Sequence, residues 1–132
     1  MGGELGFDGM SEIMSFKDLN AWQACRKLYV LTYTVTKGFP WDELFGLTSQ
    51  MRRAANSAAS NIAEGFGRET KADKLHFYTM ARGSVMELQN HAQLASDVRL
   101  LNDEILVAFE EQSIIAHKLL VGLIKSIKAK TA

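Results

Sequence analysis

Apolar residues recur at steps of three and four through most of the chain, and this spacing is the strongest constraint on its fold. In the first periodic segment the positions include Phe16, Leu19, Trp22 and Tyr29. The 132-residue chain has a single proline, Pro40. Proline is rare inside helices because it lacks a backbone N–H and clashes with the preceding turn. A helical period with almost no proline predicts an all-α fold.

Residues that commonly begin and end helices divide the periodic sequence into four segments. Side chains of Ser, Thr and Asn accept hydrogen bonds from free N–H groups at a helix start, and glycine commonly follows a helix end. The expected helices are 16–37 after the capping-box pair Ser15 and Asp18, a second from the N-cap Thr48 to its end at Gly65 and Gly67, a third from Thr70 to about 99, and a fourth from Asn102 to the C-terminal lysines.

Four helices joined by short connections predict an up-down-up-down four-helix bundle over residues 15–132. Residues 1–14 are rich in glycine and have no period, so we expect a flexible tail, with Met14 as the natural start. Trp22, Tyr29 and Trp41 are expected to be core or interface aromatics. In the fourth helix, Ile114, Leu120 and Val121 lie off the main apolar line. This surplus favours burial against another subunit, since one apolar face suffices for a single bundle, over the alternative that the fourth helix is the most central helix of a monomer.

Composition narrows the class of protein. The chain has 15 basic and 15 acidic residues, and segment 16–132 has 15 basic against 12 acidic, a mild excess that permits contact with RNA. Cys25 is the only cysteine, so a disulfide within the chain is excluded and a reducing, cytoplasmic location is expected. No apolar run approaches the roughly 18 residues of a membrane span, and the N-terminus lacks the pattern of a signal peptide.

A distinct mixture of small, polar and charged residues occupies the stretch 47–88. We expect its polar members to meet between the second and third helices, either as an anion-binding pocket or as a structural network. The structural network is favoured because a charge buried without a partner costs several kcal/mol. It would fix the register of the two helices or a contact between subunits. The expected members are Arg53, Asn61, Glu64, Arg82, Ser84 and Glu87.

Basic residues of the same stretch are candidates for nucleic-acid contact. Guanidinium and ammonium groups bind phosphates, and arginine does so with two parallel hydrogen bonds. We expect them to form a basic surface at one end of the bundle. The alternative is an ordinary solvent-exposed surface whose positive charge is balanced by Glu69 and Asp73. The candidates are Arg52, Arg53, Arg68, Lys71 and Lys74.

No pattern in the sequence indicates catalysis. No two of the three histidines, His76, His91 and His117, have the four-residue spacing of a helical metal site. Cys25 has no base near it in sequence and is expected to lie in the core or an interface. We therefore predict no catalytic residue, metal ligand, cofactor or small-molecule substrate, and a protein that is not an enzyme.

A set of short motifs in and before the stretch 47–88 is typical of one protein family. They are LTSQMRRA from Leu47 to Ala54, Ser57, NIAEG from Asn61 to Gly65, Gly67 and Arg68, ARGS from Ala81 to Ser84, Glu87 and Leu88, and FKDL from Phe16 to Leu19 with Trp22. With these residues the chain resembles the four-helix-bundle family of 23S rRNA intervening-sequence proteins. The resemblance extends over residues 16 to about 128 and implies a bacterial protein, a four-helix bundle and a ring-shaped homopentamer.

The resemblance also bears on function. Related bundle proteins are accessory factors of diversity-generating retroelements, and they bind nucleic acid and a reverse transcriptase through a basic surface. Because the charges of this chain balance and no pattern indicates catalysis, the sequence favours an oligomeric interaction or scaffold protein. The alternative is an accessory protein that binds RNA, or a nucleic-acid-processing protein, through a basic patch on the ring.

Overall fold

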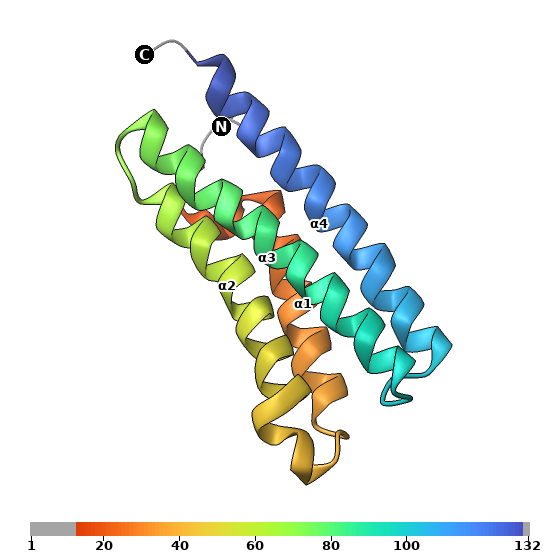
Figure 1. Cartoon of the computed structure of the whole chain (residues 1–132). Coiled ribbons are helices and arrows are strands. Elements are labelled where there is room, and N and C mark those ends of the chain that lie inside the picture. Colours follow the sequence, from red (N-terminus) through yellow and green to blue (C-terminus); the bar gives the residue numbers. More distant parts are fainter. Residues whose placement is uncertain (1–12, 131–132) are drawn as a thin grey trace.

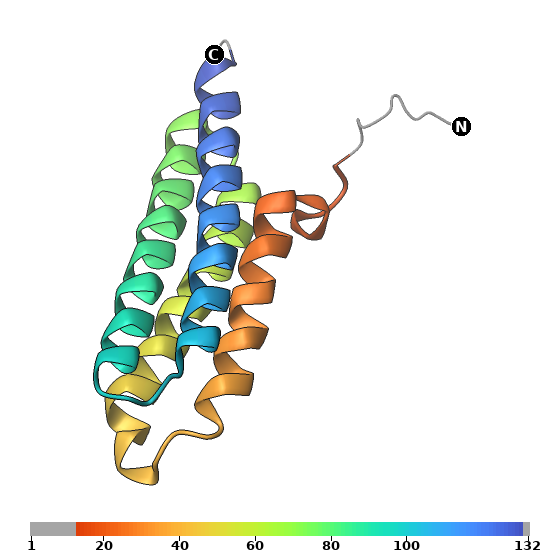
Figure 2. The same ribbon diagram turned by 90° about the vertical axis from the view of Figure 1, so that its right-hand side faces the viewer.

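The computed structural model describes residues 13–130, and this part of the chain is all-α with four long helices. Each helix packs against its neighbours in sequence, and α1 closes the bundle against α4, so the helices run alternately up and down (Figures 1 and 2). The predicted four-helix arrangement is confirmed. The helices are α1 (Asn20–Thr36), α2 (Ser49–Phe66), α3 (Lys71–Asp97) and α4 (Asp103–Ala129), with short turns η1 (Phe16–Asp18), η2 (Trp41–Glu43) and η3 (Leu44–Thr48).

The core takes one face from each helix. Its large, fully buried members are Leu28, Met51, Ile62, Tyr78, Val85, Leu88, Phe109 and Leu120. Several buried positions of α2 and α3 are alanine, including Ala55, Ala58 and Ala81, and such small side chains let the two backbones lie close together. Leu120 belongs to this core, so its predicted place outside the apolar line was wrong, whereas Ile114 is exposed and Val121 is half-buried.

The capping box at the first helix is present, but it caps a shorter element than expected. Ser15 Oγ accepts a hydrogen bond from the Lys17 amide at 3.1 Å, and Asp18 Oδ2 accepts one from the Ser15 amide at 3.0 Å. Leu19 then has an extended backbone, with φ −76° and ψ 127°. The capping box therefore closes η1, and the α-helix begins only at Asn20.

The expected N-cap at Thr48 was wrong. Its backbone is helical, at φ −55° and ψ −53°, and its side chain makes no capping bond, because η3 leads directly into α2. The carboxylate of Glu43 instead accepts a hydrogen bond from the Leu47 amide at 3.3 Å. Trp41 lies in the preceding turn and is 80% exposed, so it does not join the core.

Gly65 lies in the last turn of α2, one residue before the helix ends at Phe66. A Cβ at this position would lie 2.7 Å from Cε1 and 2.9 Å from Cδ1 of Tyr78, so only glycine lets the α3 side chain approach this closely. Gly67 is the residue that follows the helix and caps it, as predicted.

The predicted starts of α3 and α4 are confirmed. Thr70 Oγ1 accepts a hydrogen bond from the Asp73 amide at 3.1 Å, and Asn102 Oδ1 accepts one from the Ile105 amide at 2.8 Å. These caps satisfy backbone donors that the first turn of a helix leaves free. None of the described helices combines the length and apolar character of a membrane span. The predicted flexible tail falls almost entirely on residues 1–12, outside the described range.

Candidate functional site

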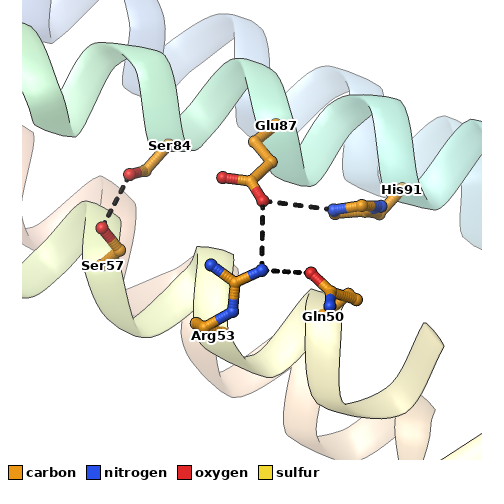
Figure 3. A network of polar contacts seen from close by, with 6 residues as sticks. All are labelled: Gln50, Arg53, Ser57, Ser84, Glu87 and His91. Carbon is orange, nitrogen blue, oxygen red and sulfur yellow. Dashed lines mark hydrogen bonds and ion pairs between the residues drawn. The ribbon is translucent and has the colours of Figure 1, made fainter. Parts of the chain in front are cut away.

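A charged network joins the outer sides of α2 and α3 (Figure 3). Arg53 Nη2 lies 3.7 Å from Glu87 Oε2 and also donates to Gln50. The same Glu87 oxygen lies 3.3 Å from His91 Nε2, one helical turn further along α3. The side chains of Arg53 and Glu87 are 61% and 40% exposed. Solvent therefore screens this ion pair, and such pairs stabilise a fold by about 1 kcal/mol at most.

A second, more buried contact lies beside the charged one. The hydroxyl oxygens of Ser57 on α2 and Ser84 on α3 are 2.8 Å apart, and either group can donate to the other. Asn61 Nδ2 donates to Ser57 Oγ at 3.0 Å and to the Ser57 carbonyl at 2.9 Å. Two short side chains that bond directly fix the helices at close separation and in one register.

The structure brings together only part of the predicted network. Arg53 pairs with Glu87 and Ser84 contacts Ser57, and both contacts lie between α2 and α3 as expected. Asn61 donates to Ser57 within α2.

The two remaining members take no part in these contacts. Glu64 pairs with Arg68 at 2.8 Å, and this guanidinium lies 4.7 Å from the centre of the Phe77 ring. Arg82 forms no ion pair with any residue in the range 13–130.

Three contributors were missing from the predicted set: Gln50, Ser57 and His91. Gln50 precedes Arg53 by three residues and Ser57 follows it by four, which places all three on one face of α2, and His91 follows Glu87 by four residues on α3. Their helical spacing is therefore the signal that would have found them.

The chemistry available in this network is limited. The Ser57 and Ser84 hydroxyls bond to each other, and Ser57 also accepts from the Asn61 side-chain amide, so these contacts supply no base to take a proton from either serine. Within the described part of the chain, no three His, Cys, Asp or Glu side chains are grouped to hold a metal ion. The geometry accounts for the positioning of α2 against α3 and supplies no paired nucleophile and base.

The single cysteine is a core residue, as predicted. Cys25 is fully buried on α1, and this burial raises the pKa of its thiol to about 12. The reactive form of cysteine is the thiolate, so the thiol is unreactive near neutral pH.

The predicted basic surface is divided between the two ends of α2. Arg52 and Arg53 lie in the first turns of the helix, whereas Arg68 follows its last residue. A rise of about 1.5 Å per residue separates Arg52 from Arg68 by roughly 24 Å along the axis. The expectation of one surface at one end was wrong, because the 18 residues of α2 are a continuous helix.

Arg52 binds the end of α1. Its Nε donates to Thr36 Oγ1 at 2.9 Å, and its guanidinium lies 4.4 Å from the centre of the Tyr33 ring. Thr36 in turn donates to the Thr32 carbonyl at 2.7 Å. Arg52 thus connects the start of α2 to the last turn of α1.

Two lysines in the first turn of α3 bind the C-terminal ends of other helices. Lys74 Nζ donates to the carbonyls of Phe66 at 2.9 Å and Gly65 at 3.2 Å. Lys71 Nζ donates to the carbonyls of Lys130 at 2.8 Å and Lys128 at 3.0 Å. Cations are favoured at such ends by the helix dipole. Burial, and then the nearby charge of Lys130, lower the pKa of Lys74.

The exposure of the charged pair leads to a first prediction. In a double-mutant cycle of Arg53→Ala and Glu87→Ala, we expect a coupling energy below about 1 kcal/mol, because water screens both groups. Urea unfolding of the four proteins measures it. A coupling above about 2 kcal/mol would show that this pair, rather than the Ser57–Ser84 contact, dominates the polar contribution to the helix pairing.

The fold and the site together define a four-helix-bundle protein whose second and third helices are joined by small residues and a polar contact. Residues 17–122 match the family model of the 23S rRNA-intervening sequence protein, and the chain belongs to this family. The resemblance noted in the sequence is thereby confirmed.

A solved structure shows the same architecture. The chain is similar to the crystal structure of a protein of unknown function from the S23 ribosomal protein family of Bacteroides thetaiotaomicron. The two are 20% identical, with a TM-score of 0.74, and the match covers 80% of this chain and 95% of that one. At this identity the similarity establishes the fold. No curated protein matches the chain.

Proposed function

We propose that this protein is a non-enzymatic interaction or scaffold protein that works as an assembly of identical subunits. The observation that carries the proposal is the number of large apolar side chains on the outer faces of the helices. Monomeric proteins seldom expose large contiguous apolar patches, and those they expose often mark sites of association. The exposed residues on α1, α3 and α4 are Val30, Met80, Met86, Leu94, Val107, Ile114 and Ile115.

Two glycines support the same proposal. Gly83 and Gly122 lie within α3 and α4, and a Cβ at either position would have no neighbour within 4 Å. Glycine inside a helix costs about 1 kcal/mol relative to alanine, and packing within the subunit gives no reason for it. Close approach of another helix would provide one.

The mass of the assembly tests this proposal. The family resemblance implies five subunits in a ring, and we expect native mass spectrometry and light scattering of the full chain to give the mass of one such ring of 14.7 kDa subunits or of a whole number of rings. A monomer at all concentrations up to about 100 μM would contradict the proposal, since interfaces of biological assemblies commonly bind more tightly than this.

A second candidate function is binding of RNA, and one cluster of charges favours it. Because Lys71 binds the end of α4, the turn between α2 and α3 lies beside that end. Five basic residues gather there: Arg68, Lys71, Lys74, Lys128 and Lys130. Such a cluster, repeated in every subunit of an assembly, would form a strong positive field.

Charge reversal at the end of α4 tests RNA binding. Lys128 and Lys130 contribute only their backbone carbonyls to the contact with Lys71, so Lys128→Glu with Lys130→Glu should leave the fold intact. We expect this variant to weaken binding of a structured RNA at least about tenfold and to reduce the salt dependence. The control reverses Lys27 and Lys37 on and just after α1. Absence of binding by the unaltered protein at low salt, measured by fluorescence anisotropy, would contradict this function.

A further inference from the structure

We infer that the outer face of α4 pairs antiparallel with the same face of a second copy of this chain, around a two-fold axis between Ile114 and Ile115. The inference rests on the proposed self-association and identifies one of its contacts. It follows from three features of α4: an outer seam of two apolar rows, the order of the charges that run between these rows, and a hollow at Gly122.

The seam lies opposite the side of α4 that enters the core. Val107, Ile114 and Ile115 are each about half exposed, although they lie in the middle of a regular helix. They belong to two rows with a seven-residue step, which is the spacing of helix–helix seams. The rows are Val107, Ile114 and Val121, and Ala108, Ile115 and Gly122.

The charges along this face select the antiparallel direction. Glu104 and Glu111 occupy its N-terminal half, and Lys118 and Lys125 its C-terminal half. All four are exposed, and none forms an ion pair with another residue in the range 13–130. Opposite charges on the two halves attract when two copies run in opposite directions. In a parallel pair at equal register, like charges would face each other.

One register of the two helices brings opposite charges together and also places larger side chains opposite smaller ones. When Glu111 of one copy is opposite Lys118 of the second, the same alignment places Glu104 opposite Lys125. It also places Val107 opposite Gly122 and Ala108 opposite Val121, so that each larger residue meets a small one. Ile114 and Ile115 meet at the axis. Small residues opposite larger ones let the two apolar rows interdigitate on either side of the charged pairs.

A hollow beside Gly122 fits this alignment. It has a volume of about 320 Å³ and lies between the start of α1 and the C-terminal half of α4. Its apolar walls include Leu19, Ala21, Leu119 and Leu123, and its polar lining residues are Asp18, Asn20 and Lys118. Since Val107 of the second copy would face Gly122, its side chain has an apolar recess to enter. The two-fold axis repeats this contact at the other end of the seam.

A contact of this kind joins subunits in pairs, because the same surface is used on both sides. On its own it gives a dimer. Added to a closed ring of five, it joins two rings and gives ten subunits. The inferred contact therefore predicts an even number of subunits in the assembly, in addition to the effects of mutations.

The test is a charge swap in the full chain. Glu111→Lys places lysine against Lys118 of the second copy at two symmetric positions, and Lys118→Glu does the same with glutamates. We expect each single variant to raise the dissociation constant of the paired assembly about tenfold or more, measured by analytical ultracentrifugation. The double variant E111K/K118E should regain association, and so should an equimolar mixture of the two single variants. Circular dichroism and thermal unfolding confirm that each variant folds.

The outcomes separate this inference from the proposed function. If the unaltered chain is a monomer, the proposed self-association fails. If it forms an assembly with an odd number of subunits whose affinity is unchanged in E111K and K118E, only the α4 pairing is wrong. Loss of association in the single variants without recovery in the double variant or the mixture also overturns the pairing, because α4 would then face a different surface.

Discussion

Replacing Gly65 by alanine is expected to lower the free energy of unfolding by about 1–3 kcal/mol. The added Cβ would lie 2.7 Å from Cε1 of Tyr78 and 3.1 Å from the Cβ of Phe77, both on α3. Tyr78 is buried, so its ring has little room to move aside, and overpacking of a core costs an amount in this range. Elsewhere in a helix the same change stabilises by about 1 kcal/mol, because alanine has a higher helix propensity than glycine. At Gly65 we expect the steric conflict with Tyr78 to outweigh this gain.

Gly67→Ala is the matched control, because its backbone is right-handed helical and its Cβ would meet only the Glu64 and Ala63 carbonyls, at 3.7 and 3.9 Å. We expect it to raise the free energy of unfolding by up to about 1 kcal/mol. Urea unfolding of both variants and the unaltered chain, at one protein concentration, measures the opposite signs, and light scattering monitors the assembly in parallel. A Gly65→Ala variant as stable as the unaltered chain would mean that α2 and α3 can move apart without cost.

The elements that sequence predicted correctly depend on local interactions. Thr70 and Asn102 cap helices through bonds to residues three positions away, so their patterns are sufficient evidence. Thr48 failed because the chain before it is already helical, as η3. Gly65 was misinterpreted for a different reason: the ring that demands glycine belongs to Tyr78, thirteen residues further along and on another helix.

The candidate site was predictable as a helix face but not as a set of partners. Helical spacing places Arg53 and Asn61 on α2 and Ser84 and Glu87 on α3, and it indicates which faces meet. It does not decide whether Glu64 pairs with Arg82 on α3 or with Arg68, four residues further along the chain. In the structure Glu64 pairs with Arg68.

The basic cluster shows the same limit. Periodicity alone cannot show that the end of α4 lies beside the first turn of α3, where Lys71 donates to the carbonyls of Lys128 and Lys130. That adjacency follows from the helix lengths and the way the bundle closes.

The protein should become markedly less stable as the pH rises above about 9, and Cys25 should be the main cause. Burial raises the pKa of this thiol from 9.0 to about 12. The folded state therefore keeps a proton that the unfolded chain releases. The stability linked to this group is fully present below pH 9.0 and is lost progressively as the pH rises through about 12. Since one pKa unit corresponds to about 1.4 kcal/mol, raising the pH from about 8 to about 10.5 should remove roughly 2 kcal/mol.

Cys25→Ala isolates this contribution. The variant loses some packing and should be less stable near pH 8, but its stability should fall much less between pH 8 and 10.5. Burial also raises the pKa of Tyr78, which acts in the same direction, and Tyr78→Phe removes that smaller part. Urea unfolding across the pH range gives both slopes. If Cys25→Ala retains the full pH dependence of the unaltered chain, the thiol is not the group whose proton the folded bundle holds, and the alkaline loss must arise from other residues.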